Sequence, residues 1–262
     1  MARTQKTALV TGASAGIGLE LARLAAKDGH DLVLVARRRD RLETLAAELT
    51  AAHGVQVTVI AADLSDQAAP AAIAERLRAD GKHIDFLINN AGFGSCGPFS
   101  KSVLDREVEM IHLNVRALAQ LTHMFLPEML ARKSGRILNV ASVAGFLPGP
   151  FMATYYASKA FVLSFTEALA AELLGTGVTI TASCPGPTQT EFGTVAGNHK
   201  SELFQLNVAQ AAPVALHAYQ AMMTGKVVAI PGLINKLIVQ STRVSPRAWL
   251  RAIAGRLNRN RT

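Results

Sequence analysis

The segment TGASAGIG at residues 11–18 decides the fold, because it joins an apolar run to a helical pattern through three glycines. Gly12 permits a tight turn, Gly16 lets the backbone approach a pyrophosphate group, and Gly18 lets the following helix pack closely on the preceding strand. The free N–H groups at the start of that helix, around Ile17, favour a phosphate anion. The G-x-x-x-G-x-G spacing differs from the commoner G-x-G-x-x-G, and an ordinary glycine-rich turn is the alternative. The strand–turn–helix context favours a bound dinucleotide.

Outward from this turn, short runs of Val, Ile and Leu alternate with longer helical patterns along the chain. The predicted strands are 7–12, 31–37, 55–64, 84–92, 135–142, 177–186 and 226–232. The predicted helices are 16–28, 40–53, 67–80, 103–132, 156–174 and 204–223. Strands with little polar alternation are typical of a parallel sheet buried on both faces, and strand–helix repetition builds right-handed crossovers. We therefore predict a single doubly wound α/β domain of about seven parallel strands, flanked by helices on both faces.

The end of the second predicted strand bears on the choice between NAD and NADP. Dinucleotide folds place a discriminating residue about 20 positions after the last glycine, and an acid there accepts from the ribose 2′-OH of NAD. In LVLVARRRDR (32–41), Ala36 takes that place, and Arg37 and Arg38 follow it. Guanidinium groups pair well with a 2′-phosphate, and Ser14 in the glycine-rich turn is a further donor. The pattern favours NADP, with NADPH preferred over NADH, and a solvated arginine loop is the alternative.

The composition excludes several classes of protein. Of the 262 residues, 50% are hydrophobic, 18% charged and 5% aromatic, which is typical of a compact globular chain rather than a disordered one. The sequence has no apolar stretch long enough to span a membrane and no signal-peptide pattern. Cys96 and Cys184 are far apart, so free thiols in a reducing cytosol, and thus a cytoplasmic location, are expected. The histidines show no metal-ligand spacing, and we predict no metal ion.

The positive charge is concentrated in the last quarter of the chain. The net charge is +8, and the last 60 residues contain eight Lys and Arg residues and no acid. In the extension 233–262, the apolar residues Trp249, Leu250, Ile253 and Leu257 recur at helical spacing among arginines. A basic amphipathic helix is able to contact an anionic membrane peripherally, and we keep this as a hypothesis, but a helix packed on a subunit with one solvated face is the favoured interpretation. Nucleic acid is not expected, because no reading motif accompanies the charge.

Six motifs in a fixed order resemble the short-chain dehydrogenase/reductase family. They are TGASAGIG (11–18), NNAG (89–92), Asn114, Ser142, Tyr155-x-x-x-Lys159 and PGPTQT (185–190). The resemblance covers residues 6–232, and NNAGFG together with the tail is most similar to bacterial DltE-like reductases. It implies a Rossmann-like catalytic domain over 1–232, followed by the basic extension 233–262. It also implies a homodimer or homotetramer, in which the apolar helices 103–132 and 156–174 pair across subunits.

The implied reaction is NADPH-dependent transfer of hydride to a carbonyl carbon, which requires a group that polarises the carbonyl oxygen and delivers a proton. Tyrosine is a poor acid at neutral pH unless a nearby cation lowers its pKa from about 10. Lys159 lies one helical turn after Tyr155, on the same helix face. The resemblance implies that Tyr155 is the general acid, and that Lys159 lowers its pKa and binds the nicotinamide ribose.

Two further residues complete the implied catalytic set. Ser142 would hydrogen-bond the substrate oxygen, and Asn114 would hold a water that links Lys159 to solvent. Taken singly, Ser142 is typical of a turn at a strand end, and Asn114 is typical of a mid-helix polar residue bonded to backbone. Tyr156 is the rival proton donor, because both tyrosines lie within about 60° of Lys159 around a helix. The spacing of thirteen residues between Ser142 and Tyr155 matches the family and favours Tyr155, which leaves Tyr156 as packing or pocket wall.

Further cofactor contacts follow from the resemblance and lie in three segments: Asp63 and Leu64, Asn90, and the loop residues Pro185, Gly186, Thr188 and Thr190. Asp63 would accept from the adenine amino group, with Leu64 beside the ring, or Asp63 is a strand-end acid that starts a turn. Asn90 would lie near the adenosine ribose. The loop residues would flank the nicotinamide, and either threonine could reach its carboxamide.

The expected substrate walls are 93–99, 143–152 and 188–223, and they are mainly apolar. This composition favours an apolar ketone or aldehyde over a sugar or a charged metabolite. One alternative is an NADP-linked alcohol or hydroxysteroid dehydrogenase that works oxidatively. Another is a non-catalytic NADP(H) sensor, against which the intact set of Asn, Ser, Tyr and Lys argues.

Overall fold

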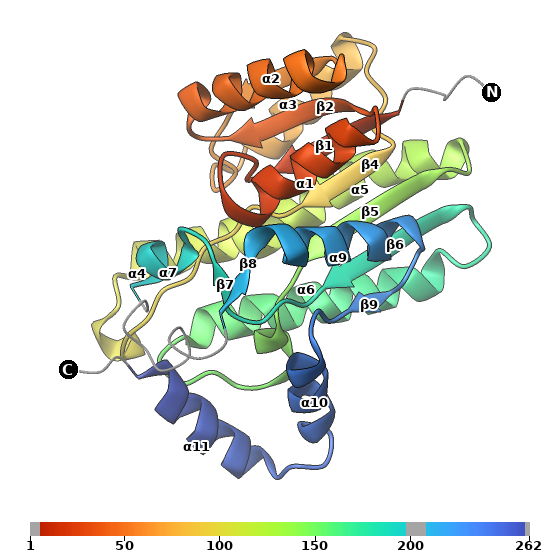
Figure 1. Ribbon diagram of the computed structural model, residues 1–262. Helices are drawn as coiled ribbons and strands as arrows, with labels where there is room; N and C mark the ends of the chain where they lie inside the picture. The colour runs from red at the N-terminus through yellow and green to blue at the C-terminus, as the bar shows by residue number, and fades with distance from the viewer. Residues whose placement is uncertain (1–5, 198–207, 260–262) are drawn as a thin grey trace.

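Seven parallel strands form the sheet of the computed structural model, which describes residues 6–197 and 208–259 (Figure 1). Their spatial order is β3-β2-β1-β4-β5-β6-β9. The strands are β1 (Thr7–Thr11), β2 (Asp31–Ala36), β3 (Val57–Ala61), β4 (Phe86–Asn89), β5 (Gly135–Val140), β6 (Val178–Ser183) and β9 (Val228–Ala229). Their central Val, Leu and Ile side chains are buried because helices cover both faces. The prediction of one doubly wound parallel α/β fold is confirmed.

The helices form a layer on each face of the sheet (Figure 1). The first layer contains α1 (Gly16–Lys27), α2 (Arg39–His53) and α9 (Ala211–Met223). The second contains α3 (Ala69–Ala79), α5 (Leu118–Ala131) and α6 (Ala153–Glu172). Each layer buries its own apolar cluster against the strands. Strands are added to one side of β1 up to β3 and to its other side from β4 on, so a crevice for a ligand is expected at the carboxyl ends of β1 and β4.

The predicted helix 103–132 is interrupted. It consists of α4 (Leu104–Ile111), a wider π-helical turn over His112–Ala117, and α5. Asn114 lies inside this π-helical turn, where its side chain bonds the backbone of Phe93 rather than its own helix. An extra residue per turn re-aims side chains, and such turns often mark functional sites.

The predicted helix 204–223 begins later than expected, at Ala211, and residues 204–207 lie outside the described part of the chain. Ahead of it, β8 (Ala209–Gln210) pairs with β7 (Thr188–Gln189), and the short helix α7 (Phe192–Ala196) follows β7. Pro213 lies in the first turn of α9, where a residue without an N–H is tolerated.

The C-terminal extension forms two helices, α10 (Leu233–Ser241) and α11 (Arg247–Asn258), below the carboxyl ends of the strands in Figure 1. The turn between them ends at Pro246, which precedes the first residue of α11. Both helices lie against loops of the preceding part of the chain through contacts described below. Within the described residues, no helix combines the length and apolarity that crossing a bilayer requires.

Candidate active site

The glycine-rich turn leaves no room for larger residues. Gly12 and Gly16 adopt left-handed backbone conformations, with φ of 67° and 57°. A Cβ atom at Gly18 would lie 2.3 Å from Nδ2 of Asn90 and 2.4 Å from the carbonyl oxygen of Gly12. A Cβ at Gly16 would lie 2.8 Å from Cγ2 of Thr190. The loop that contains Thr190 therefore lies directly over the turn, and only glycine fits at Gly16 and Gly18. Dinucleotide folds present such a bare backbone to a pyrophosphate group.

Two neighbouring features hold this turn and keep its donors free. Asn90 donates from Nδ2 to the carbonyl oxygen of Thr11 at 2.9 Å, so its side chain ties β4 to the end of β1. No side chain caps the first turn of α1, and the side chain of Ile17 packs against the core cluster of that face. The N–H groups at the start of α1 are thus available to an anion.

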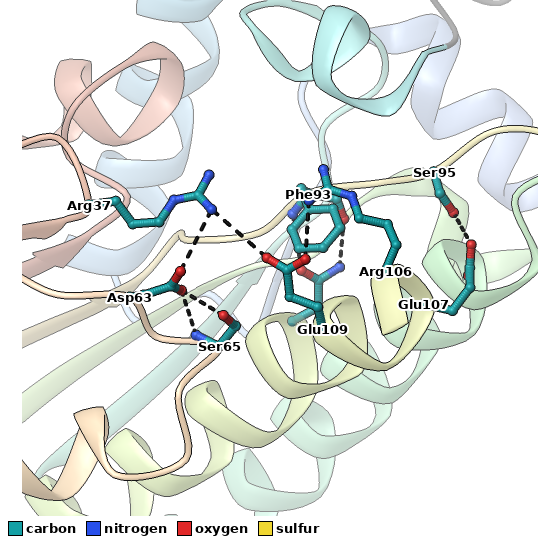
Figure 2. A network of polar contacts seen from close by, with 9 residues as sticks. Arg37, Asp63, Ser65, Phe93, Ser95, Arg106, Glu107 and Glu109 are labelled. Carbon is teal, nitrogen blue, oxygen red and sulfur yellow. Dashed lines mark hydrogen bonds and ion pairs between the residues drawn. The ribbon is translucent and has the colours of Figure 1, made fainter. Parts of the chain in front are cut away.

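The arginines after β2 point in two directions. Arg38 donates from Nη2 to Oγ of Ser14 at 3.1 Å and forms a 2.8 Å ion pair with Glu191. Arg37 instead extends toward Asp63 and Glu109, at 3.7 and 3.9 Å (Figure 2). Of the two guanidinium groups, that of Arg38 is the one bonded to the glycine-rich turn.

Glu191 was not predicted as a site residue. Its carboxylate joins Arg38 and Arg41, with a 2.6 Å contact to the latter. The hydrogen bond from Arg41 is the largest cause that lowers the pKa of Glu191, so the carboxylate stays ionised. A carboxylate on Arg38 is placed to compete with a 2′-phosphate for the same guanidinium group.

Asp63 forms the turn that the alternative interpretation expected. Its Oδ1 accepts from N and Oγ of Ser65 at 2.9 and 2.7 Å. Burial acts to raise the pKa of Asp63, but the bonds from Ser65 and the charge of Arg37 outweigh it, so the pKa is lowered. Leu64 is buried and lines a small hollow together with Thr11 and neighbouring side chains of β4 and α5. An adenine contact for Asp63 and Leu64 stays a prediction.

Tyr155 and Lys159 lie on successive turns of α6. The ammonium nitrogen of Lys159 is 5.8 Å from the centre of the Tyr155 ring and donates to the carbonyl oxygen of Val140 at 2.8 Å. Burial lowers the pKa of Lys159 to about 8. Burial also raises the pKa of Tyr155, and a hydrogen bond with Ser142 acts in the opposite direction. In this structure burial, rather than Lys159, sets the direction of the Tyr155 pKa shift.

Ser142 faces the same site from the end of β5. Its Oγ accepts from the backbone N–H of Ala144 at 3.1 Å and donates to the carbonyl oxygen of Pro185 at 3.3 Å. Both bonds restrain the hydroxyl beside Tyr155. The structure therefore brings the hydroxyls of Ser142 and Tyr155 together beside the Lys159 cation.

Asn114 is buried behind this group. Its Nδ2 donates to the carbonyl oxygen of Phe93 at 2.9 Å and to Oγ of Ser158 at 3.1 Å, and its Oδ1 accepts from the N–H of Phe93. A Cβ placed on Gly92 would meet both Asn114 and Lys159, which shows that these side chains share one narrow space. Oδ1 has a second lone pair, so the predicted water between Asn114 and Lys159 is chemically reasonable.

The loop after β6 carries the remaining predicted residues. Oγ1 of Thr188 donates to the carbonyl oxygen of Gly186 at 3.0 Å, and Oγ1 of Thr190 accepts from the N–H of Phe192 at 3.2 Å. A Cβ at Gly186 would lie 2.6 Å from Oδ1 of Asn235 on α10. The predicted nicotinamide loop is thus close to both the glycine-rich turn and the C-terminal extension, and neither threonine is favoured over the other.

Tyr156 points away from this chemistry. It is 7% exposed, and its hydroxyl donates to Oδ1 of Asn258 in α11 at 3.0 Å. Its ring packs in an apolar cluster that also contains Cys96, Leu147, Met152, Tyr155 and Phe192. That cluster unites side chains from all three predicted substrate walls; Phe204, in the third wall, lies outside the described residues.

No group of His, Cys, Asp and Glu side chains suited to a metal ion occurs in residues 6–197 and 208–259.

Comparison with known proteins shows the family to which the chain is similar. Residues 6–201 match the family described as short chain dehydrogenase. A very-long-chain 3-oxoacyl-CoA reductase of Anas platyrhynchos is 35% identical over 195 residues, which are 72% of this chain and 62% of that protein. A short-chain dehydrogenase from Sphingobium yanoikuyae in complex with NADPH has a TM-score of 0.82 at 37% identity, over 91% of this chain and 94% of the other. One from Burkholderia phymatum in complex with NAD has a TM-score of 0.80 at 29% identity, over 90% and 92%.

The chain therefore belongs to the short-chain dehydrogenase/reductase family, as the motifs predicted. It spans 61% to 63% of the length of the first curated relatives that it matches. The particular similarity to DltE-like reductases stays a prediction.

Proposed function

We propose that the protein is an NADPH-dependent carbonyl reductase that acts on an apolar ketone or aldehyde. The observation that supports this most directly is the grouping of Ser142, Tyr155 and Lys159 at the carboxyl ends of the strands. Bound NADPH would supply the hydride. The glycine-rich turn and the uncapped start of α1 would hold its pyrophosphate, because the free N–H groups there favour an anion.

The protein's own residues would polarise the carbonyl and deliver the proton. The hydroxyls of Tyr155 and Ser142 would both donate to the carbonyl oxygen, which stabilises the negative charge that develops there. As the alkoxide forms, Tyr155 would transfer its proton to that oxygen. The buried Lys159 cation would stabilise the phenolate left behind and bind the nicotinamide ribose. Asn114 would hold the water through which Lys159 exchanges protons with solvent.

The preference for NADPH is proposed from the arginines that follow β2. Arg38 is bonded to Ser14 in the glycine-rich turn, and Arg37 pairs with Asp63. The relatives do not decide the point, since one solved neighbour is in complex with NADPH and another with NAD. The proposed preference for NADPH therefore rests on the positive charge of these arginines, because a guanidinium group attracts the 2′-phosphate that only NADP carries.

We expect Arg38→Asp to raise the Kd for NADPH by about 10- to 100-fold and the Kd for NADH by less than about threefold. Arg37→Asp should act in the same direction with a smaller effect, because Arg37 is not bonded to the turn. Arg39→Asp is the matched control, since Arg39 pairs with Glu43 away from the turn. Fluorescence titration with both cofactors measures all four proteins. Equal losses of affinity for NADPH and NADH in the Arg38 variant would contradict the assignment of Arg38 to the 2′-phosphate.

An apolar substrate is proposed from the side chains beside the two hydroxyls. The ring of Phe192 lies 5.0 Å from that of Tyr155, and Leu147 and Met152 pack in the same cluster. The name of the Anas platyrhynchos relative, a very-long-chain 3-oxoacyl-CoA reductase, is in line with a long apolar carbonyl compound. A panel of apolar ketones and aldehydes, assayed with NADPH and NADH in parallel, tests the proposal. Tight NADPH binding without turnover of any of them would favour a sensor, and turnover only of alcohols with NADP would favour the oxidative alternative.

A homodimer or homotetramer is proposed from an exposed apolar surface on α4 and α6. Leu104, Val108 and Ile111 are exposed on α4, and Phe161 is exposed on α6, where it stacks on Phe165. Pairing of these helices across subunits would bury this surface. Light scattering of the purified protein tests the proposal, and a monomer at micromolar concentration would refute it.

A cytoplasmic location is proposed from the two free cysteines, Cys96 and Cys184. Peripheral membrane contact through the C-terminal extension is proposed from the charge of that extension. The extension has several arginines and no acid. Charge of one sign beside apolar side chains is typical of surfaces that bind anionic lipid.

A further inference from the structure

We propose that the outer face of α10 and α11 docks on an anionic bilayer and holds the mouth of the active site against it, so that the apolar substrate enters from lipid. This inference rests on the proposed carbonyl reductase and concerns how its substrate arrives. Three observations carry it: an exposed apolar surface, positive charge around that surface, and contacts from the opposite face of the same helices to the substrate walls.

The apolar surface lies on both helices of the extension. On α10, Leu233 is 72% exposed and Leu237 62% exposed, and on α11, Trp249 is 67% exposed and Ile253 58% exposed. In contrast, Leu250 and Ala254 of α11 are buried. The helix therefore has an apolar outer face as well as an apolar inner one, although only the inner face is covered by its own chain. A Trp among aliphatic side chains is suited to the boundary between headgroups and acyl chains.

The charge around this surface selects the partner. Lys236, Arg243, Arg247 and Arg251 all lie on or between the two helices, and all four are exposed. The chain contains no Asp or Glu after Glu202, so no acidic side chain of the extension offsets these cations. A surface for a second copy of this chain would place like charges opposite each other, whereas an anionic headgroup layer complements them. An anionic bilayer is accordingly the occupant that we propose.

The inner face of α11 is fastened to the substrate walls by one buried residue. Asn258 is 1% exposed. Its Nδ2 donates to the carbonyl oxygen of Pro150 at 3.0 Å, its Oδ1 accepts from Tyr156, and its carbonyl oxygen accepts from the Cys96 thiol at 3.4 Å. A Cβ at Gly255 would be only 3.4 Å from Pro150, so the helix backbone lies close to this loop. Asn258 therefore connects α11 to two predicted substrate walls and to the residue next to Tyr155.

The loop that Asn258 holds is itself strained. Phe151 has a φ of 68°, an unfavourable conformation for a side chain of that size. Its carbonyl oxygen accepts from the N–H of Gly97 at 2.8 Å, and the Arg259 guanidinium lies 5.3 Å from its ring. A strained segment held by contacts with the extension can respond when the extension moves on a bilayer. Docking and access to the site are thereby linked through one helix.

The binding experiment uses the full-length protein and sedimentation with vesicles of phosphatidylcholine, with or without about 30 mol% phosphatidylglycerol. We expect the wild type to sediment with the anionic vesicles and to be released as salt rises. A Trp249→Ser/Ile253→Ser double variant should bind at least about fivefold more weakly. Leu174→Ser is the matched control, because Leu174 is 81% exposed in the turn that follows α6, outside the extension, and its loss should not change binding to vesicles. Equal sedimentation of the wild type and the double variant would overturn the docking surface.

The kinetic experiment compares a water-soluble aromatic ketone without vesicles and a long-chain ketone dissolved in the anionic vesicles. The double variant should reduce the soluble ketone like the wild type and show an apparent KM at least about fivefold higher for the vesicle-bound ketone. An unchanged KM in a variant that no longer sediments would overturn delivery from lipid. Absence of turnover with both ketones would refute the proposed function, while sedimentation would still test docking. Dissociation of an oligomer by the double substitution, seen by light scattering, would make the surface a subunit interface and overturn the proposal.

Discussion

Tyr155→Phe is expected to lower kcat by at least about 10³-fold while the Kd for NADPH stays within about twofold of the wild type. The substitution removes the proton that we assign to the substrate oxygen and one of the two donors that polarise the carbonyl. It leaves the ring in place against Phe192 and the glycine-rich turn unchanged. Single-turnover reduction at saturating NADPH, together with fluorescence titration of NADPH, separates lost chemistry from lost binding.

Tyr156→Phe is the matched control, because it makes the same change one residue away. Tyr156 donates to Asn258, so its loss leaves a buried amide oxygen without that donor and should lower the free energy of unfolding by about 1–2 kcal/mol. Turnover of a water-soluble ketone should stay within about threefold of the wild type. If the two variants exchanged these phenotypes, the proton donor would be Tyr156 and the role of Ser142 would have to be reassigned.

Residues whose role depends on local backbone geometry could be predicted from the sequence. The turn at Gly12 and Gly16 needs left-handed backbone, and glycine adopts it without strain, so the motif carries its own physical reason. Tyr155 and Lys159 lie one turn apart on a helix, and that relation is fixed once the helix is recognised. The buried strands could equally be predicted from the sequence, because short runs of Val, Ile and Leu without polar alternation are typical of strands covered on both faces.

Contacts between distant segments could not be predicted in the same way. Glu191 is 150 positions from Arg41, and Asn258 is 102 positions from Tyr156. No local pattern marks a surface acid as the partner of an arginine, or a C-terminal asparagine as the partner of a tyrosine, because both pairings depend on how loops pack. The excess of arginine in the extension was visible in the sequence. The structure was needed to show that α11 has one exposed face and one face packed against the predicted substrate walls. The π-helical turn at Asn114 was likewise hidden inside a helical pattern.

Lys159→Met is expected to abolish turnover. It should also remove a pH-dependent loss in the free energy of unfolding. Burial lowers the pKa of Lys159 to about 8, from an ordinary value of 10.5. The pKa of Lys159 is lower in the folded protein than in the unfolded chain, so folding disfavours the charged form. Below pH 8 the wild type therefore carries the full free-energy cost of burying this charge. Between pH 8 and 10.5 the unfolded chain binds more protons, and the free energy of unfolding contributed by this group therefore rises with pH. A difference of about 2.5 pH units corresponds to about 3 kcal/mol.

The methionine variant has nothing to titrate at this position, so its stability relative to the wild type should be greatest near pH 7 and decline toward pH 10. The lost bond to the carbonyl oxygen of Val140 offsets about 1 kcal/mol of the gain at every pH. Urea unfolding of both proteins across this range measures the difference, and Lys101→Met controls for loss of an exposed lysine. A constant difference between wild type and Lys159→Met from pH 7 to 10 would mean that Lys159 is not held as a buried cation. Loss of activity together with a gain in stability at pH 7 would instead show that the cation is retained for chemistry at the expense of the fold.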